Sequence, residues 1–141
     1  RVLKDGESIT LGDLSMQAHL TPGHTKGCTT WTMTVQDHGK SYNVVFVGGT
    51  SINRGVKMIG NERHPGILED YARTFEVLKG LEVDVFLAQH PSMYGMAEKA
   101  VTARRARTNR NPFIDPAGYR KFVAGEEQKY LDQVAKERAG N

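Results

Sequence analysis

The spacing of apolar residues changes its period about halfway along the chain, and this change restricts the possible folds more than any other sequence feature. Residues 14–20 and 30–35 alternate apolar and polar side chains, which is typical of half-buried strands. Residues 42–47 form a nearly unbroken apolar run, as in a strand covered on both faces. From Ile67 to Leu78, apolar residues recur at three- and four-residue steps, as on one helix face. The pattern predicts an α/β (α+β) fold.

The second half of the chain predicts further elements in alternation. Pro65 fits the first turn of the helix that precedes Gly80. Residues 83–88 indicate a short buried strand, and residues 96–107 are compatible with a helix. With no repeat and no linker in the sequence, we expect residues 1–141 to form a single domain.

A last helix is predicted after the proline-containing loop at residues 109–116. Asp115 suits its N-cap, and Pro116 suits its first position, where a missing N–H costs little. Gly125 interrupts the apolar stripe of this segment and weighs against one continuous helix.

Composition excludes several classes of protein. Nineteen basic and sixteen acidic residues give a formal charge of +3, and four arginines gather at positions 104, 105, 107 and 110. No aromatic residues interleave with them, so we expect a solvated surface and no nucleic-acid partner. No apolar run approaches the roughly 20 residues that span a bilayer. Cys28 is the single cysteine, so no disulfide forms within the chain, and a small buried apolar role is expected for it.

Two histidines stand at predicted strand ends. His24 follows the turn residues Pro22 and Gly23, and His90 follows the strand at 83–88. Neutral imidazole is the commonest metal ligand, and side chains at sheet ends often carry chemistry. On the residues alone, a structural role for each histidine remains the commoner alternative.

The segments around these histidines resemble the metallo-β-lactamase superfamily. Residues 18–31, Ala-His-Leu-Thr-Pro-Gly-His-Thr-Lys-Gly-Cys-Thr-Thr-Trp, contain its Thr-Pro-Gly-His-Thr segment, and the continuation Gly-Cys-Thr-Thr-Trp is similar to the third β-lactamase subclass. Further similar segments are residues 44–50, 60–71, 84–91 and 111–116. The resemblance implies the C-terminal half of an αβ/βα sandwich, with one sheet and flanking helices.

The resemblance also implies roles for individual residues. His24 matches a ligand of the first of two zinc ions, and His90 matches a ligand of the second. Thr50 falls near a position that orients water or the substrate carboxylate. Further substrate-binding candidates are Ser51, Asn53 and Arg54, which follow Thr50 in the same loop. Tyr94, just past His90, is another, with a packing role as an equal alternative. No residue of this chain is expected to be directly catalytic.

The family's His-X-His-X-Asp-His motif is absent from these 141 residues. We expect neither His19, His38, His64 nor Cys28 to replace it. The resemblance implies that the full-length protein opens β-lactam rings by attack of a metal-bound hydroxide, and that this chain alone is inactive. Because the chain starts at Arg1 without a signal segment, we expect further residues upstream. The resemblance also implies a periplasmic or secreted bacterial protein that confers antibiotic resistance.

Three alternatives remain at this point. A thioesterase or lactonase of the same superfamily shares Pro-Gly-His-Thr, although residues 47–50 lack the Asp that bridges the metals in those relatives. A non-catalytic fragment that acts as an interaction module is the second. The third concerns the partner: half a sandwich exposes an apolar sheet face, which either the missing N-terminal half or a second copy would cover.

Overall fold

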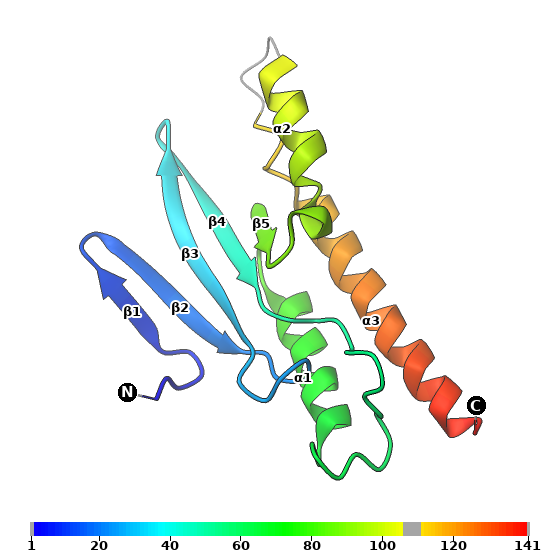
Figure 1. The fold of residues 1–141 in the computed structure, drawn as a ribbon. Coiled ribbons are helices and arrows are strands. Elements are labelled where there is room, and N and C mark those ends of the chain that lie inside the picture. The colour runs from blue at the N-terminus through cyan, green and yellow to red at the C-terminus, as the bar shows by residue number, and fades with distance from the viewer. Residues whose placement is uncertain (1, 106–110, 141) are drawn as a thin grey trace.

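The computed structural model describes residues 2–105 and 111–140 (Figure 1). Four strands come first: β1 (Ser8–Leu11), β2 (Leu14–Leu20), β3 (Thr29–Asp37) and β4 (Lys40–Val47). Then follow α1 (Ile67–Gly80), β5 (Val85–Ala88), the 3₁₀ turn η1 (Pro91–Tyr94), α2 (Met96–Arg105) and α3 (Pro116–Arg138). β2 and β3 therefore lie where the two-residue period predicted strands, β4 and β5 where the apolar runs did, and α1 where the longer period predicted a helix. β1 was not predicted as a separate strand.

The strands form one sheet in sequence order, β1-β2-β3-β4-β5. The first four are antiparallel, whereas β5 pairs with β4 in parallel, with Val47 opposite Ala88 at their C-terminal ends. A parallel pair needs a long crossover connection, and residues 48–84 with α1 provide it. The carboxyl ends of β4 and β5 consequently meet at one edge of the sheet.

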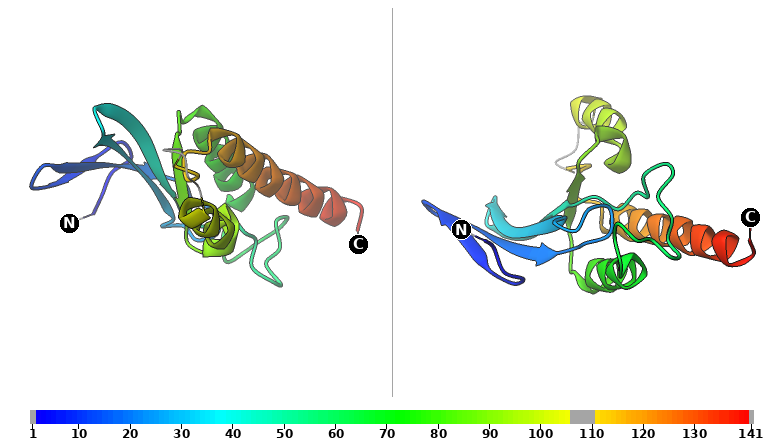
Figure 2. Two further views of the ribbon diagram at one scale, coloured as in Figure 1. Left: turned by 90° about the horizontal axis from the view of Figure 1, so that it is seen from above. Right: turned by 60° about the horizontal axis from the view of Figure 1, so that its bottom comes forward.

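The hydrophobic core lies between one face of the sheet and the helices α1 and α3 (Figure 2). Val45, Val47 and Phe86 face it from the sheet. Tyr130 of α3 stacks on Tyr71 of α1 and lies tilted against Phe75, with ring centroids 5.5 and 5.8 Å away. Burial of these large rings joins α1 to α3 and both to the central strands.

The opposite face of the sheet is apolar but lies outside this core. The register places the alternating apolar residues of all five strands on it: Ile9, Leu11, Leu14, Met16, Ala18, Leu20, Trp31, Met33, Val35, Tyr42, Val44, Phe46, Val85 and Leu87. None of them belongs to the core cluster. At its outer end, Leu11 is 81% and Leu14 56% exposed, whereas Ala18 and Val44 nearer its centre are buried. We call this surface the open sheet face.

The local predictions are confirmed for the start of α3 and for the end of α1 at Gly80, and wrong for the start of α1. Asp115 caps α3 by accepting a hydrogen bond from Gly118 N at 2.8 Å, and Pro116 is its first residue, as predicted. Gly125 does not interrupt α3, which is continuous. Pro65 lies outside α1, contrary to prediction, because Gly66 takes the N-cap position with φ 86°.

The basic cluster is only partly described. Arg104 and Arg105 end α2 in exposed positions, whereas Arg107 and Arg110 lie outside the described residues, as does the end of the helix predicted for 96–107. Over residues 2–105 and 111–140, none of the helices has the length and apolar character needed to cross a membrane.

Candidate functional site

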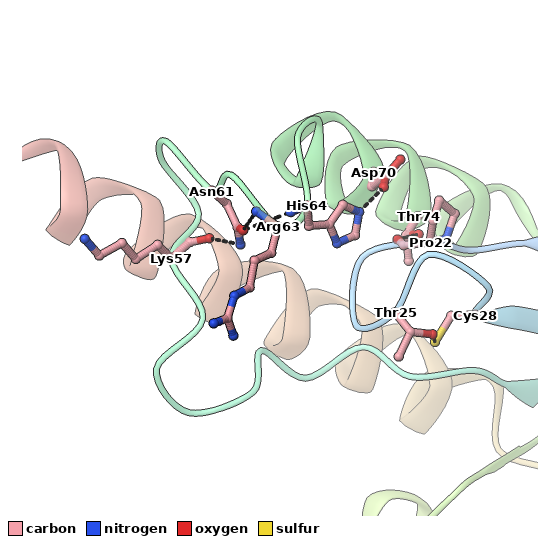
Figure 3. A network of polar contacts seen from close by, with 9 residues as sticks. All are labelled: Pro22, Thr25, Cys28, Lys57, Asn61, Arg63, His64, Asp70 and Thr74. Atoms are coloured by element: carbon pink, nitrogen blue, oxygen red, sulfur yellow. Dashed lines mark hydrogen bonds and ion pairs between the residues drawn. The ribbon is translucent and has the colours of Figure 1, made fainter.

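His24 sits in a tight turn between β2 and β3. The turn is closed by Thr21 N, which donates to Cys28 O at 2.9 Å, and it is tied to α1 by Thr74 Oγ1, which donates to Pro22 O at 2.6 Å (Figure 3). Gly23 adopts φ 137°, and a Cβ there would lie 2.9 Å from the ring of Tyr71. The Pro-Gly sequence therefore allows the turn to approach α1 closely, as other residues would not.

The imidazole of His24 is held by the segment that follows β4. Its Nδ1 lies 2.6 Å from the carbonyl oxygen of Ser51, and a carbonyl only accepts, so Nδ1 carries the hydrogen. The hydroxyl of Tyr71 donates to the same oxygen at 2.9 Å. Burial raises the pKa of Tyr71, which keeps this hydroxyl protonated. The Nε2 of neutral His24 is then left with its lone pair, which is the state that binds a metal.

His90 reaches the same edge of the sheet by another route. It lies two residues beyond Ala88, and Gly49 lies two residues beyond Val47, which pairs with Ala88. The ring of His24 packs on Gly49, where a Cβ would be 2.6 Å from His24 Cδ2. The turn and the parallel strand pair thus bring both histidines to the carboxyl ends of β4 and β5. His90 itself is exposed, and its carbonyl accepts from Met93 N at 3.0 Å.

The predicted substrate-binding residues have different environments. Thr50 is 3% exposed, and its hydroxyl donates into the interior, to Glu126 at 3.0 Å. Ser51 orients His24 through its carbonyl, with its Oγ 3.4 Å from Nδ1. Asn53 and Arg54 are exposed on the loop after β4. Their proposed contacts with a substrate stay predictions, and the inward hydroxyl of Thr50 indicates a structural role in this conformation.

Tyr94 also packs inward in part. Its ring meets Phe86 edge to face, with centroids 6.3 Å apart, and its hydroxyl lies 3.2 Å from Met96 Sδ. The packing role that was the alternative for this residue is therefore present in the structure.

A pocket of about 570 Å³ opens between the His24 turn and the loop at residues 53–64. Sequence reasoning had not assigned Lys57, Arg63 or Tyr71 to a site, yet they line this pocket together with His24 and His64. Asn61 braces the loop: its amide donates to Lys57 O at 2.7 Å and accepts from the N–H groups of Arg63 and His64 (Figure 3). An asparagine shortly before a helix is the sequence signal that predicts such bracing.

The remaining candidate ligands have other partners. His64 Nε2 lies 2.6 Å from Asp70 Oδ2, and His19 Nε2 lies 2.8 Å from Thr32 Oγ1. His38 is exposed in the β3–β4 turn beside Asp37. Cys28 is a free thiol, half-buried, 3.2 Å from Thr25 Oγ1 (Figure 3).

The donor set present fits a zinc site only in part. A catalytic zinc normally takes about three protein ligands. Within the part of the chain that the structure describes, no three His, Cys, Asp or Glu side chains come together to hold a metal. The hydrogen bond of Nδ1 to the Ser51 carbonyl leaves Nε2 of His24 available to a metal, whereas a complete coordination sphere would require donors from elsewhere.

Comparisons with solved structures agree on one fold. The native FEZ-1 metallo-β-lactamase of Legionella gormanii matches 96% of this chain at 40% identity and a TM-score of 0.92. BJP-1, a subclass B3 metallo-β-lactamase of Bradyrhizobium japonicum, matches 99% at 36% identity and a TM-score of 0.88. The chain covers 51% and 52% of these two proteins, about half of their length.

A curated protein of Burkholderia pseudomallei, named "Probable metallo-hydrolase", is 42% identical over 52 residues, which are 36% of this chain and 18% of that protein. No protein-family model matches the chain. The structural agreement nevertheless extends over nearly the whole of this chain, at 36–40% identity. The chain has the fold of the metallo-β-lactamases and is similar in sequence to subclass B3 enzymes and to a metallo-hydrolase, and it spans about half of the length of the solved enzymes.

Proposed function

We propose that this chain is part of a zinc-dependent β-lactamase and that it contributes one ligand to each of two metal ions, His24 to the first and His90 to the second. The observation that supports this most directly is the hydrogen bond between His24 Nδ1 and the carbonyl of Ser51, at the sheet edge that His90 also reaches. When bound, zinc provides a nucleophilic water near neutral pH and polarises the carbonyl under attack.

The residues of this chain would do the positioning. Ser51 and Tyr71 hold the imidazole of His24, and Asn53 and Arg54 lie exposed on the loop beside it, where a substrate carboxylate would meet them. The absence of Asp from residues 47–50 favours a β-lactam over a thioester or lactone substrate. Such an enzyme would work in the periplasm or outside the cell, where it would protect a bacterium from β-lactam antibiotics.

A partner for the open sheet face is part of this proposal. The remaining donors and the cover for this face would come from the rest of the domain, which the solved relatives contain in the half that this chain does not match. A second sheet packed face to face at about 10 Å would bury these apolar side chains.

Nitrocefin hydrolysis by the whole protein tests the function. We expect zinc-dependent turnover, and a loss of more than about 100-fold in His24→Ala and in His90→Ala, because removal of even an outer partner of a metal ligand costs 10–100-fold. His38→Ala is the matched control, since His38 is exposed in a distant turn. Residues 1–141 alone should show no turnover.

Other results would contradict the proposal in distinct ways. Turnover that survives a chelator, or that His24→Ala leaves unchanged, would exclude this metal site. Hydrolysis of a thioester or a lactone without hydrolysis of nitrocefin would favour the other hydrolases of the superfamily. Absence of zinc binding in calorimetry on the whole protein would favour an interaction module.

A further inference from the structure

Glu126 is a carboxylate buried in the interior. It lies in the middle of α3 with 7% of its surface exposed, and it is the one charged residue among the buried residues of the described part of the chain. Its Oε1 contacts Lys129 Nζ one turn along the helix, at 2.5 Å, and its Oε2 accepts a hydrogen bond from Thr50 Oγ1 at 3.0 Å. Burying a carboxylate costs several kcal/mol unless hydrogen bonds compensate, whereas an apolar side chain would pack there without this cost.

The partner of Glu126 belongs to the segment that holds His24. Gly48 N donates to Thr30 Oγ1 at 3.1 Å, Gly49 supports the ring of His24, and the carbonyl of Ser51 accepts from its Nδ1. Thr50 stands between Gly49 and Ser51, and its hydroxyl donates to the buried Glu126. Of the residues 48–51, it is therefore the one whose side chain anchors this segment to α3.

We propose that Glu126 is a positioning residue: through Thr50 it fixes the segment after β4, so that the carbonyl of Ser51 stays in place to orient His24 as a metal ligand. Glu126 touches neither His24 nor any reacting group. The inference rests on the proposed function, since it assigns Glu126 a part in preparing that metal site. Groups behind a metal ligand that hold it in one tautomer commonly affect metal affinity.

A purely structural role for Glu126 makes the opposite prediction. If the carboxylate served only to pack α3 on the sheet, its replacement would change stability and leave His24 as it is. If it positions the segment, replacement by Leu would leave the melting temperature equal or higher, because a buried charge is lost, while the imidazole would lose its fixed tautomer. The two roles are therefore separable within one variant.

The experiment compares the whole protein with Glu126→Leu, Glu126→Gln and Glu127→Gln. Gln at position 126 keeps an acceptor for Thr50, and Glu127 is the matched control because it pairs with Lys79 at 2.7 Å on the surface. Imidazole ¹⁵N NMR of the zinc-free protein reports the tautomer of His24, and calorimetry reports zinc affinity. We expect Glu126→Leu to mix the two tautomers and to lower zinc affinity about tenfold, and both Gln variants to stay within about twofold of wild type.

The possible failures are distinguishable. If His24 carries its hydrogen on Nε2 in the wild-type protein, the ligand geometry of the proposed function is wrong. If the wild type has the Nδ1–H tautomer and Glu126→Leu retains both this tautomer and full zinc affinity, Glu126 is not a positioning residue. A loss in Glu126→Gln as large as that in Glu126→Leu would exclude the hydrogen bond to Thr50 as the route.

Discussion

The environment of His24 depends on two glycines whose missing side chains leave room for rings. Gly23 accommodates the ring of Tyr71, and Gly49 accommodates the imidazole itself. Both contacts join segments distant in sequence. Because each glycine lies against a ring, an added methyl group at either position would have to displace that ring rather than a flexible chain end. In a closely packed interior such displacement is costly.

Gly49→Ala is expected to destabilise the protein by about 1–3 kcal/mol and to move His24 off the Ser51 carbonyl, because the new Cβ would lie 2.6 Å from Cδ2 of the ring. Gly27→Ala, in the same turn as His24, is the control: a methyl group there would meet no atom within 4 Å, so its effect should stay within about 0.5 kcal/mol. Urea denaturation measures both. Equal stability of the two variants would show that the ring adjusts freely.

The motif around His24 indicated the residue but not its supports. The turn residues Pro22 and Gly23 stand beside it in sequence and were predictable from their conformational preferences. Ser51, which orients the ring, lies 27 positions away, and Glu126 lies 76 positions beyond Thr50. Such contacts depend on how β4 and α3 pack, and no local pattern encodes them.

At the scale of elements, α3 shows which local signals are decisive. The Asp-Pro start was predictable because it satisfies backbone groups within the helix itself. Gly125 costs about 1 kcal/mol in a helix interior, and the burial of Tyr119, Val123 and Tyr130 on either side outweighs it. The prediction for Pro65 was wrong because the helix begins after Gly66, whose positive φ leaves Pro65 outside the helix.

Asp115→Ala should lower the free energy of unfolding by about 1 kcal/mol at neutral pH, through loss of the N-cap. The hydrogen bond from Lys99, followed by that from Gly118 N, holds the pKa of Asp115 below its ordinary value of 3.8. A lowered folded-state pKa means that the carboxylate stabilises the fold above the unfolded value and that this contribution is lost as the pH falls through the folded-state pKa.

The difference between wild type and Asp115→Ala should therefore narrow below pH 3.8. Asp115→Asn keeps a capping side chain, so it should retain most of the stability at pH 7 but lack the acid dependence. Chemical denaturation at neutral and acid pH separates these effects. A constant difference across this range would show that the charge of Asp115 does not contribute.

In the molecule as a whole, the two faces of the sheet differ in what packs against them. Alternation in β2 and β3 correctly predicted strands with one apolar side, but the sequence does not reveal what lies against that side. The helices of this chain cover the face with Val45 and Val47, and the open sheet face, with Trp31 and Met33, lies outside that core. The chain spans about half the length of its solved relatives, and the cover proposed for the open sheet face would come from the part that it does not match.

Met33→Lys on the open sheet face tests whether the rest of the domain covers it. In residues 1–141 alone, an exposed apolar sheet should self-associate and bind a hydrophobic dye, and a lysine there should reduce both. In the whole protein the same lysine would be buried without a partner, and the melting temperature should fall. Thr34→Lys, on the other face of the same strand and exposed, should change neither sample appreciably. Light scattering, dye binding and thermal melts measure these effects. A monodisperse 15.7 kDa wild-type chain that binds no dye would show that this face needs no cover. A whole protein that tolerates Met33→Lys as well as Thr34→Lys would show the same.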